Sequence, residues 1–142
     1  MSNYNSDFYS WTQEQAALIR AGRLSELDLE NLVEEIETMG RSEKTALESR
    51  LTVLIVHLLK WQYQPVGRGN NWKYTIDDQR RKFQKVLKDN PGLKAQLDEI
   101  LSDAYEQALH NASFETGLME SIFTPKLAWT LDQLCESSFY PD

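Results

Sequence analysis

Apolar residues recur along this chain at the spacing of α-helices rather than with the alternation of strands. One stripe of such positions consists of Leu29, Leu32, Val33, Ile36 and Met39. A second stripe consists of Leu47, Leu51, Leu54, Leu58 and Trp61, and further apolar residues at 53, 55, 56 and 59 make this segment hydrophobic nearly all round. A helix of that kind is normally enclosed by other helices. We therefore predict a central helix over about 43–63.

Residues that start or stop helices divide the rest of the chain. Thr12 and Gln15 have the spacing of a capping box, and so do Thr130 and Gln133. Gly40 predicts the end of one helix, since glycine readily adopts the left-handed geometry found there. The signals together predict helices near 13–22, 25–39, 43–63, 75–89, 91–116 and 130–137. The expected fold class is all-α, a single domain over 1–142 with about five to six helices around the central one.

Composition limits the class of protein. The chain has 142 residues, of which 41% are hydrophobic and 11% aromatic, as is typical of a globular domain. Its single cysteine, Cys135, cannot form an internal disulfide, which favours a reducing compartment. The first residues lack the pattern of a secretory signal, and the longest apolar run, Leu51–Leu59, is about half as long as a membrane span. We expect a cytoplasmic protein that does not enter a membrane.

The net charge of −7 is unevenly distributed. Eight acidic and two basic residues give residues 1–40 a net charge of −6. Eleven basic and five acidic residues give 41–90 a net charge of +6, and 91–142 carries −7. The basic middle is either neutralised by the acidic ends of the chain or left as a basic face on an acidic body.

Several blocks of sequence together resemble a known family. They are Asp7-Phe8-Tyr9-x-Trp11, Leu24-x-x-Leu27-Asp28, Leu32-x-Glu34-Glu35-Ile36-Glu37, Met39-Gly40-x-Ser42, His57 through Pro65 and Trp129 through Leu134. The chain resembles the bacterial family called "domain of unknown function twenty-nine" over nearly its whole length. This resemblance implies an all-α bundle and no settled biochemical activity. The chain departs from the family at Leu127-Ala128, where the family has a cysteine–proline pair.

A polar site is one hypothesis for the place where the helices 25–39 and 43–63 would face each other. Its residues are Asp28, Glu35, Glu37, Arg50, His57, Lys60 and Trp61. Glutamate and histidine on facing helices hold metals inside some bundles, but the Glu-x-x-His spacing of those centres is absent, so we predict no metal and no cofactor. His57 is interpreted either as a core imidazole bonded to a backbone carbonyl or to a carboxylate such as Asp28, or as a general base or pH switch.

A nucleic-acid interface is the hypothesis for the segment 68–88. Its residues are Arg68, Trp72, Lys73, Arg80, Arg81 and Lys85. Cations neutralise phosphates and aromatic rings stack on unpaired bases, so this mixture suits nucleic acid. A solvated basic face with internal ion pairs is the alternative interpretation. Arg80 lies near the apolar side of its helix, where we expect a buried ion pair with an acid of another segment.

Three functions follow from these features. The first is a small protein-interaction or regulatory module without catalysis of its own, which binds an unidentified protein partner or a second copy of itself. Aromatic residues outside the stripes, such as Phe8, Tyr9, Trp11 and Tyr140, would offer surface to that partner. The second is a nucleic-acid-binding protein that uses the segment 68–88. The third is an enzyme with a Glu–His metal centre.

Overall fold

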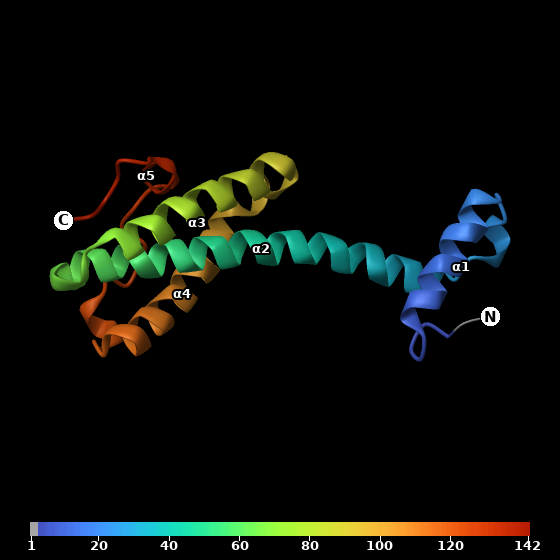
Figure 1. The fold of residues 1–142 in the computed structure, drawn as a ribbon, viewed down its shortest axis with the longest axis horizontal. Helices are drawn as coiled ribbons and strands as arrows, with labels where there is room; N and C mark the ends of the chain where they lie inside the picture. Colours follow the sequence, from blue (N-terminus) through green and yellow to red (C-terminus); the bar gives the residue numbers. More distant parts are fainter. Residues whose placement is uncertain (1–2) are drawn as a thin grey trace. The chain divides into compact units, whose positions relative to one another are not determined.

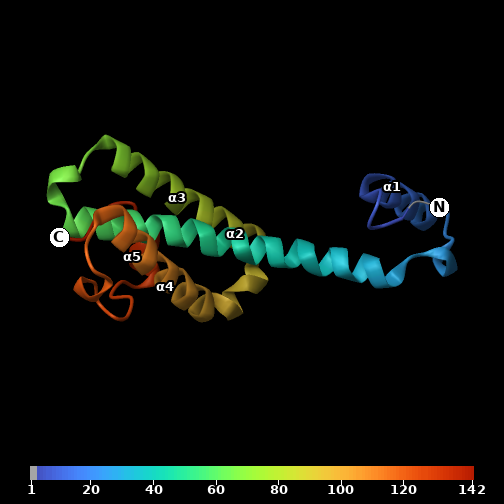
Figure 2. The same ribbon diagram turned by 90° about the horizontal axis from the view of Figure 1, so that it is seen from below.

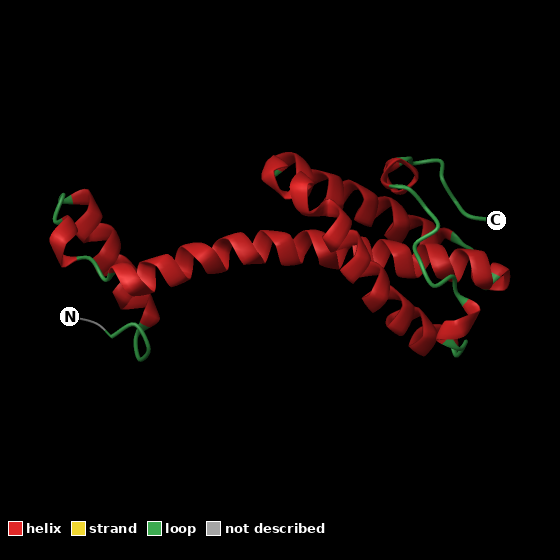
Figure 3. Ribbon diagram, turned by 180° about the vertical axis from the view of Figure 1, so that it is seen from behind, coloured by secondary structure: helices red, strands yellow, loops and turns green. Residues whose placement is uncertain are grey.

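A computed structural model describes residues 3–142 of the chain. Within these residues all regular structure is helical, without strands (Figure 3). The α-helices are α1 (Phe8–Arg20), α2 (Leu29–Tyr63), α3 (Asn70–Asp89), α4 (Leu97–Thr116) and α5 (Leu131–Cys135). Short 3-10 helices lie between them: η1 (Leu24–Glu26), η2 (Pro65–Gly67), η3 (Pro91–Gln96) and η4 (Glu120–Ile122). The predicted all-α fold class is confirmed.

The chain separates into two compact units. The N-terminal unit ends at Ser42, and the C-terminal unit is Glu43–Asp142. The prediction of one domain over 1–142 is not tested by this division and stays a prediction. No helix in the described residues is both long enough and apolar enough to span a membrane.

The predicted break between the second and third helices is wrong, because α2 runs without interruption from Leu29 to Tyr63. Gly40 does not adopt the positive φ of a helix end, unlike Gly117 (φ 76°), which ends α4. Glycine in a helix interior costs roughly 1 kcal/mol relative to alanine. The neighbouring Glu, Lys, Ala and Leu residues are good helix formers, so the helix continues through this weak point.

The two predicted capping boxes have opposite outcomes. Thr130 accepts a hydrogen bond from the Gln133 amide and the Gln133 side chain bonds the Thr130 backbone, so the box before α5 is confirmed. The box at Thr12 is wrong, since α1 begins at Phe8 and its N-cap is Asp7. Asp7 accepts from the Ser10 amide at 3.1 Å, and the Thr12 hydroxyl donates instead to the Tyr9 carbonyl oxygen. An aspartate is as good a cap as a threonine, and it lies where the chain turns into the helix.

The core of the C-terminal unit surrounds the predicted central segment of α2. Figures 1 and 2 both show α3 and α4 beside the C-terminal half of α2, on different sides of it. The side chains with no exposed surface are Leu47, Leu51, Leu54, Ile55, Leu58, Ile76, Phe83, Ile100, Ala104, Ala108, Ala112 and Leu134. They come from α2, α3, α4 and α5, so the helix predicted to be central contributes the most residues to this core.

The N-terminal unit has a much smaller core. Trp11, Gln15 and Leu18 of α1 are buried. The stripe predicted at 29–39 is present on α2, but it is not covered by the described residues: Leu29, Val33, Ile36 and Met39 are 52–62% exposed. Leu32 of the same stripe is half-buried.

Candidate functional site

Asp28 organises the junction between η1 and α2. The Trp11 indole Nε1–H donates to Asp28 Oδ2 at 3.0 Å, and Asn31 Nδ2 donates to the same oxygen at 2.8 Å. The Asp28 backbone N–H donates to Gln15 Oε1 at 2.9 Å. The hydrogen bonds from Asn31 and then from Trp11 hold the pKa of the Asp28 carboxyl below its usual range. Asp28 therefore connects α1 to the start of α2.

The other two acidic candidates of this unit have separate partners. Tyr4 donates to Glu35, and this hydrogen bond raises the pKa of Tyr4 to about 12. The Tyr4 ring also packs edge-on against Trp11, with 4.7 Å between ring centroids. Glu37 lies 3.7 Å from Arg41 in an exposed ion pair. The two carboxylates thus lie on the borders of the apolar stripe and do not converge on one point.

His57 does not face a second helix that carries Glu35 and Glu37, because all three residues belong to α2. Side chains on one helix meet when they are three or four residues apart, and this spacing is absent here. The His57 Nδ1–H donates to the Val53 carbonyl oxygen at 2.9 Å. Burial lowers the pKa of His57. Of the predicted partners, the structure therefore shows the backbone carbonyl.

Metal ligands do not gather elsewhere in the described chain either, where no group of three or more His, Cys, Asp or Glu side chains is arranged to hold a metal ion. Arg50, another residue of the predicted polar site, also lies on α2 and is half-buried.

The end of α2, the connection to α3 and the start of α3 form a cluster of cations and aromatic rings, which Tyr140 joins with its ring centroid 4.8 Å from that of Trp61. We call it the Trp61 cluster (Lys60, Trp61, Arg68, Trp72, Lys73 and Tyr140). Arg68 Nε donates to the Trp61 carbonyl oxygen at 2.7 Å, and its guanidinium lies 5.3 Å from the Trp61 ring centroid. The Lys73 ammonium lies 5.8 Å from that centroid. Lys60 lies 5.1 Å from the Trp72 ring and pairs with Glu115 at 3.3 Å. Such contacts stabilise each pair modestly and fix the loop between α2 and α3.

The sequence placed Lys60 and Trp61 in one candidate site and Arg68, Trp72 and Lys73 in another, and the structure brings all five together. The short connection through η2 returns the chain onto the end of α2. Gly67 lies against the Trp72 ring so closely that a Cβ there would overlap it. The sequence signal for this tight connection was Pro65, Gly67 and Gly69, which lie between the aromatic residues of the two helix ends.

The nucleic-acid candidates on α3 divide into a buried arginine and exposed cations. Arg80 is buried and donates to the carbonyl oxygens of Leu134 at 2.9 Å, Ser137 at 3.3 Å and Phe139 at 2.5 Å. The expected ion pair with an acid of another segment is therefore wrong, since backbone carbonyls take its place.

Arg81 and Lys85 are exposed and pair with acids of their own helix, Asp78 at 3.6 Å and Asp89 at 3.1 Å. Lys44 and Lys60, in contrast, pair with Glu99 and Glu115 of α4. The basic middle of the chain is thus neutralised partly by its own acids and partly by the acidic C-terminal third.

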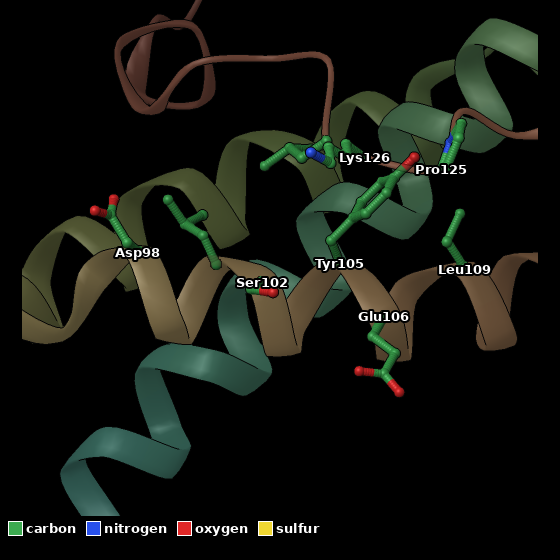
Figure 4. Close-up of a pocket in the computed structure, with 9 residues that line it drawn as sticks. Asp98, Ser102, Tyr105, Glu106, Leu109, Pro125 and Lys126 are labelled. Atoms are coloured by element: carbon green, nitrogen blue, oxygen red, sulfur yellow. The ribbon is translucent and has the colours of Figure 1, made fainter.

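A groove on α4 is a feature that sequence reasoning missed (Figure 4). It has a volume of about 480 Å³ and is lined by Asp98, Leu101, Ser102, Tyr105, Glu106, Leu109, Pro125, Lys126 and Leu127. The Tyr105 hydroxyl donates to the Thr124 carbonyl oxygen at 2.5 Å and so holds the loop over α4. Leu101 and Leu109 pack against the core and remain only partly buried, so each also contributes apolar surface to the groove. The volume is within the range of small-ligand sites.

Exposed apolar side chains concentrate in the N-terminal unit. Thirteen large apolar side chains are largely exposed in the described chain, and eight of them precede residue 43. These eight are Phe8, Tyr9, Ile19, Leu24, Leu29, Val33, Ile36 and Met39. Single exposed apolar residues are normal, but a contiguous patch on a helix indicates an interaction site.

Comparison with known proteins agrees with the resemblance seen in the sequence. The family model described as "Domain of unknown function DUF29" matches residues 3–140. No curated protein and no solved structure matches the chain.

Proposed function

We propose that this chain, which belongs to the DUF29 family, is a cytoplasmic protein-interaction module. The contact surface in this proposal is the exposed face of α2 formed by Leu29, Val33, Ile36 and Met39, here called the α2 apolar face. Exposure of these four side chains is the observation that carries the proposal.

The spacing of these residues supports recognition of another helix or of a groove. Leu29, Val33 and Ile36 are separated by four and three residues, so they lie one above the other on α2. Anchors at this spacing are the means by which an amphipathic helix docks with a partner. The patch is on the order of 400 Å², within the range of functional patches on monomeric proteins.

Site-specific photo-cross-linking in cells of the source organism tests the proposal. A benzoylphenylalanine replaces Val33 in one variant and Phe114, an apolar residue of the C-terminal unit that is 88% exposed, in the control. We expect a discrete adduct at position 33 that disappears when Ile36→Asp is added, and none at position 114. Mass spectrometry of the adduct identifies the cross-linked chain. Absence of an adduct at position 33, or its persistence with Ile36→Asp, would refute this function.

Nucleic-acid binding is a second candidate, favoured by the exposure of Arg81 and Lys85 on one side of α3. Arg80 does not take part, because its guanidinium is buried. Binding to single- or double-stranded DNA or RNA would weaken steeply with salt, and Arg81→Ala with Lys85→Ala would reduce that slope. No binding at low salt would rule this candidate out.

A further inference from the structure

We propose that the occupant of the α2 apolar face is a basic amphipathic helix of another protein. This inference rests on the proposed function and adds the chemistry of the partner. The partner helix places an apolar stripe along Leu29, Val33 and Ile36 and directs lysine or arginine side chains toward Glu30 and Glu37.

The placement of these residues around α2 gives the face one acidic border. At about 100° per residue, Leu29, Val33 and Ile36 fall within roughly 60° of arc. Glu30 and Glu37 follow at one edge, about 40–60° beyond Val33. Both are exposed, and Glu30 has no partner among the described residues. The opposite edge is closed by Glu35 together with Tyr4, which donates to it. A partner therefore meets two carboxylates along one side of the apolar stripe: Glu30, which has no partner among the described residues, and Glu37, whose ion pair with Arg41 is exposed.

The charge of the whole unit favours the same partner. Residues 1–42 contain eight acidic and three basic residues, a net charge of −5. Two of the three basic residues are already paired, Arg23 with Glu26 and Arg41 with Glu34 and Glu37. A negative surface speeds association with cations and opposes like-charged partners.

A second copy of the chain suits the face poorly. It would bring two units of charge −5 together with the same acidic border on each. The patch of about 400 Å² is also about half of the roughly 800 Å² that each partner buries in a stable complex of standard size. A small apolar stripe with an acidic border is better matched to a helix that wraps the patch with its own long basic side chains.

Gly40 adds an observation independent of charge. It is an interior residue of α2, where glycine is unfavourable, and a Cβ built on it meets nothing within 4 Å. On the helical wheel it falls between Leu29 and Val33, at the end of the α2 apolar face. No contact within the described chain requires glycine at this position. Close approach of a partner's backbone would require it, because a side chain there would keep the two backbones apart. Alanine at this position should therefore help the free chain and hinder the complex.

The test uses the purified full chain and two labelled synthetic helices of about 20 residues, a length at which isolated helices become stable. Both carry leucines on one face, and the borders carry lysines in one peptide and glutamates in the other. Fluorescence anisotropy at low salt measures binding. We expect the lysine peptide to bind at least about tenfold more tightly than the glutamate peptide, because its lysines attract Glu30 and Glu37 whereas glutamates at the same positions repel them.

Variants assign this preference to the face. Glu30→Lys with Glu37→Lys should reverse the preference, and Ile36→Asp should abolish binding of both peptides. Gly40→Ala should weaken binding severalfold although it raises the melting temperature. Phe114→Asp is the control that changes an exposed apolar residue elsewhere, and it should leave binding unchanged. Circular dichroism confirms that each variant is folded.

The outcomes separate this inference from the proposed function. Equal binding of the two peptides, lost with Ile36→Asp, would overturn the basic partner and keep the function. A dimer seen by light scattering and lost with Ile36→Asp would do the same, since a second copy would then occupy the face. Failure of either peptide to bind, together with a monomer and no adduct at position 33, would overturn both.

Discussion

Arg80→Met is expected to lower the free energy of unfolding of the C-terminal unit by about 3–5 kcal/mol. Arg80 is 2% exposed, and its three nitrogens donate to the carbonyl oxygens of Leu134, Ser137 and Phe139. Each hydrogen bond from a charged donor contributes roughly 1.5–3 kcal/mol net, so three give roughly 5–9 kcal/mol. Methionine fills much of the same volume and avoids the several kcal/mol that burial of a charge costs, which reduces the loss.

Urea denaturation followed by circular dichroism measures this loss, and Arg81→Met is the matched control. Arg81 is the next residue of α3, but it is exposed and its ion pair with Asp78 is of the surface type, so its loss should cost no more than about 0.5 kcal/mol. Hydrogen exchange should also rise in residues 134–140 of the Arg80→Met variant. Similar losses for the two variants, or a loss below about 1 kcal/mol for Arg80→Met, would show that the carbonyl contacts do not stabilise the fold.

Three further predictions concern other parts of the chain. Gly40→Ala should raise the free energy of unfolding by about 0.5–1 kcal/mol in urea titrations, because its Cβ meets open space in a helix interior, and a loss would contradict this geometry. Tyr105→Phe should cost about 1–2 kcal/mol in thermal unfolding, since the Thr124 carbonyl loses its donor, whereas exposed Tyr74→Phe should be neutral. The pKa of His57 is lowered in the fold, so the unfolded chain binds the proton more readily and stability should fall as pH drops below about 6.5. His57→Gln should make the melting temperature depend less on pH between neutral and mildly acidic conditions. An unchanged dependence would show that other groups cause it.

The sequence predicted the central helix well for a physical reason. A helix that is apolar on nearly all sides is unstable at a surface, so the other helices were expected to cover Leu51–Leu59. The capping box at Thr130 was equally local, because both of its hydrogen bonds join residues three apart.

The division of α2 at Gly40 was mispredicted because glycine occurs both at helix ends and inside helices, and the sequence does not distinguish the two cases. At a helix end it adopts a positive φ, as Gly117 does, whereas inside a helix it is merely unfavourable. The stripe at 29–39 was found correctly, but periodicity reports which side of a helix is apolar, and it does not report whether another element covers that side. That the stripe is exposed can be seen only in the three-dimensional structure.

The candidate sites were predicted less well than the fold, and Arg80 shows why. Its acceptors are backbone carbonyls, and every residue has one, so no residue type marks them in a sequence. The Trp61 cluster was found in two halves, since its cations and rings lie on either side of a tight connection whose path depends on Gly67 and Trp72. For His57 the sequence left a backbone carbonyl and a carboxylate open as partners, and the structure shows the Val53 carbonyl oxygen. Glu35 and Glu37 do not face His57, because all three residues belong to one helix.

The distance in sequence between Arg80 and its acceptors has a consequence for biosynthesis. They are separated by 54 to 59 positions. A ribosome that adds roughly 5–20 residues per second needs roughly 3–12 s to translate this interval. Until then the guanidinium must remain hydrated, so the nascent α3 cannot close fully onto α2. The C-terminal unit can therefore close fully only after residues 134–139 have left the ribosome.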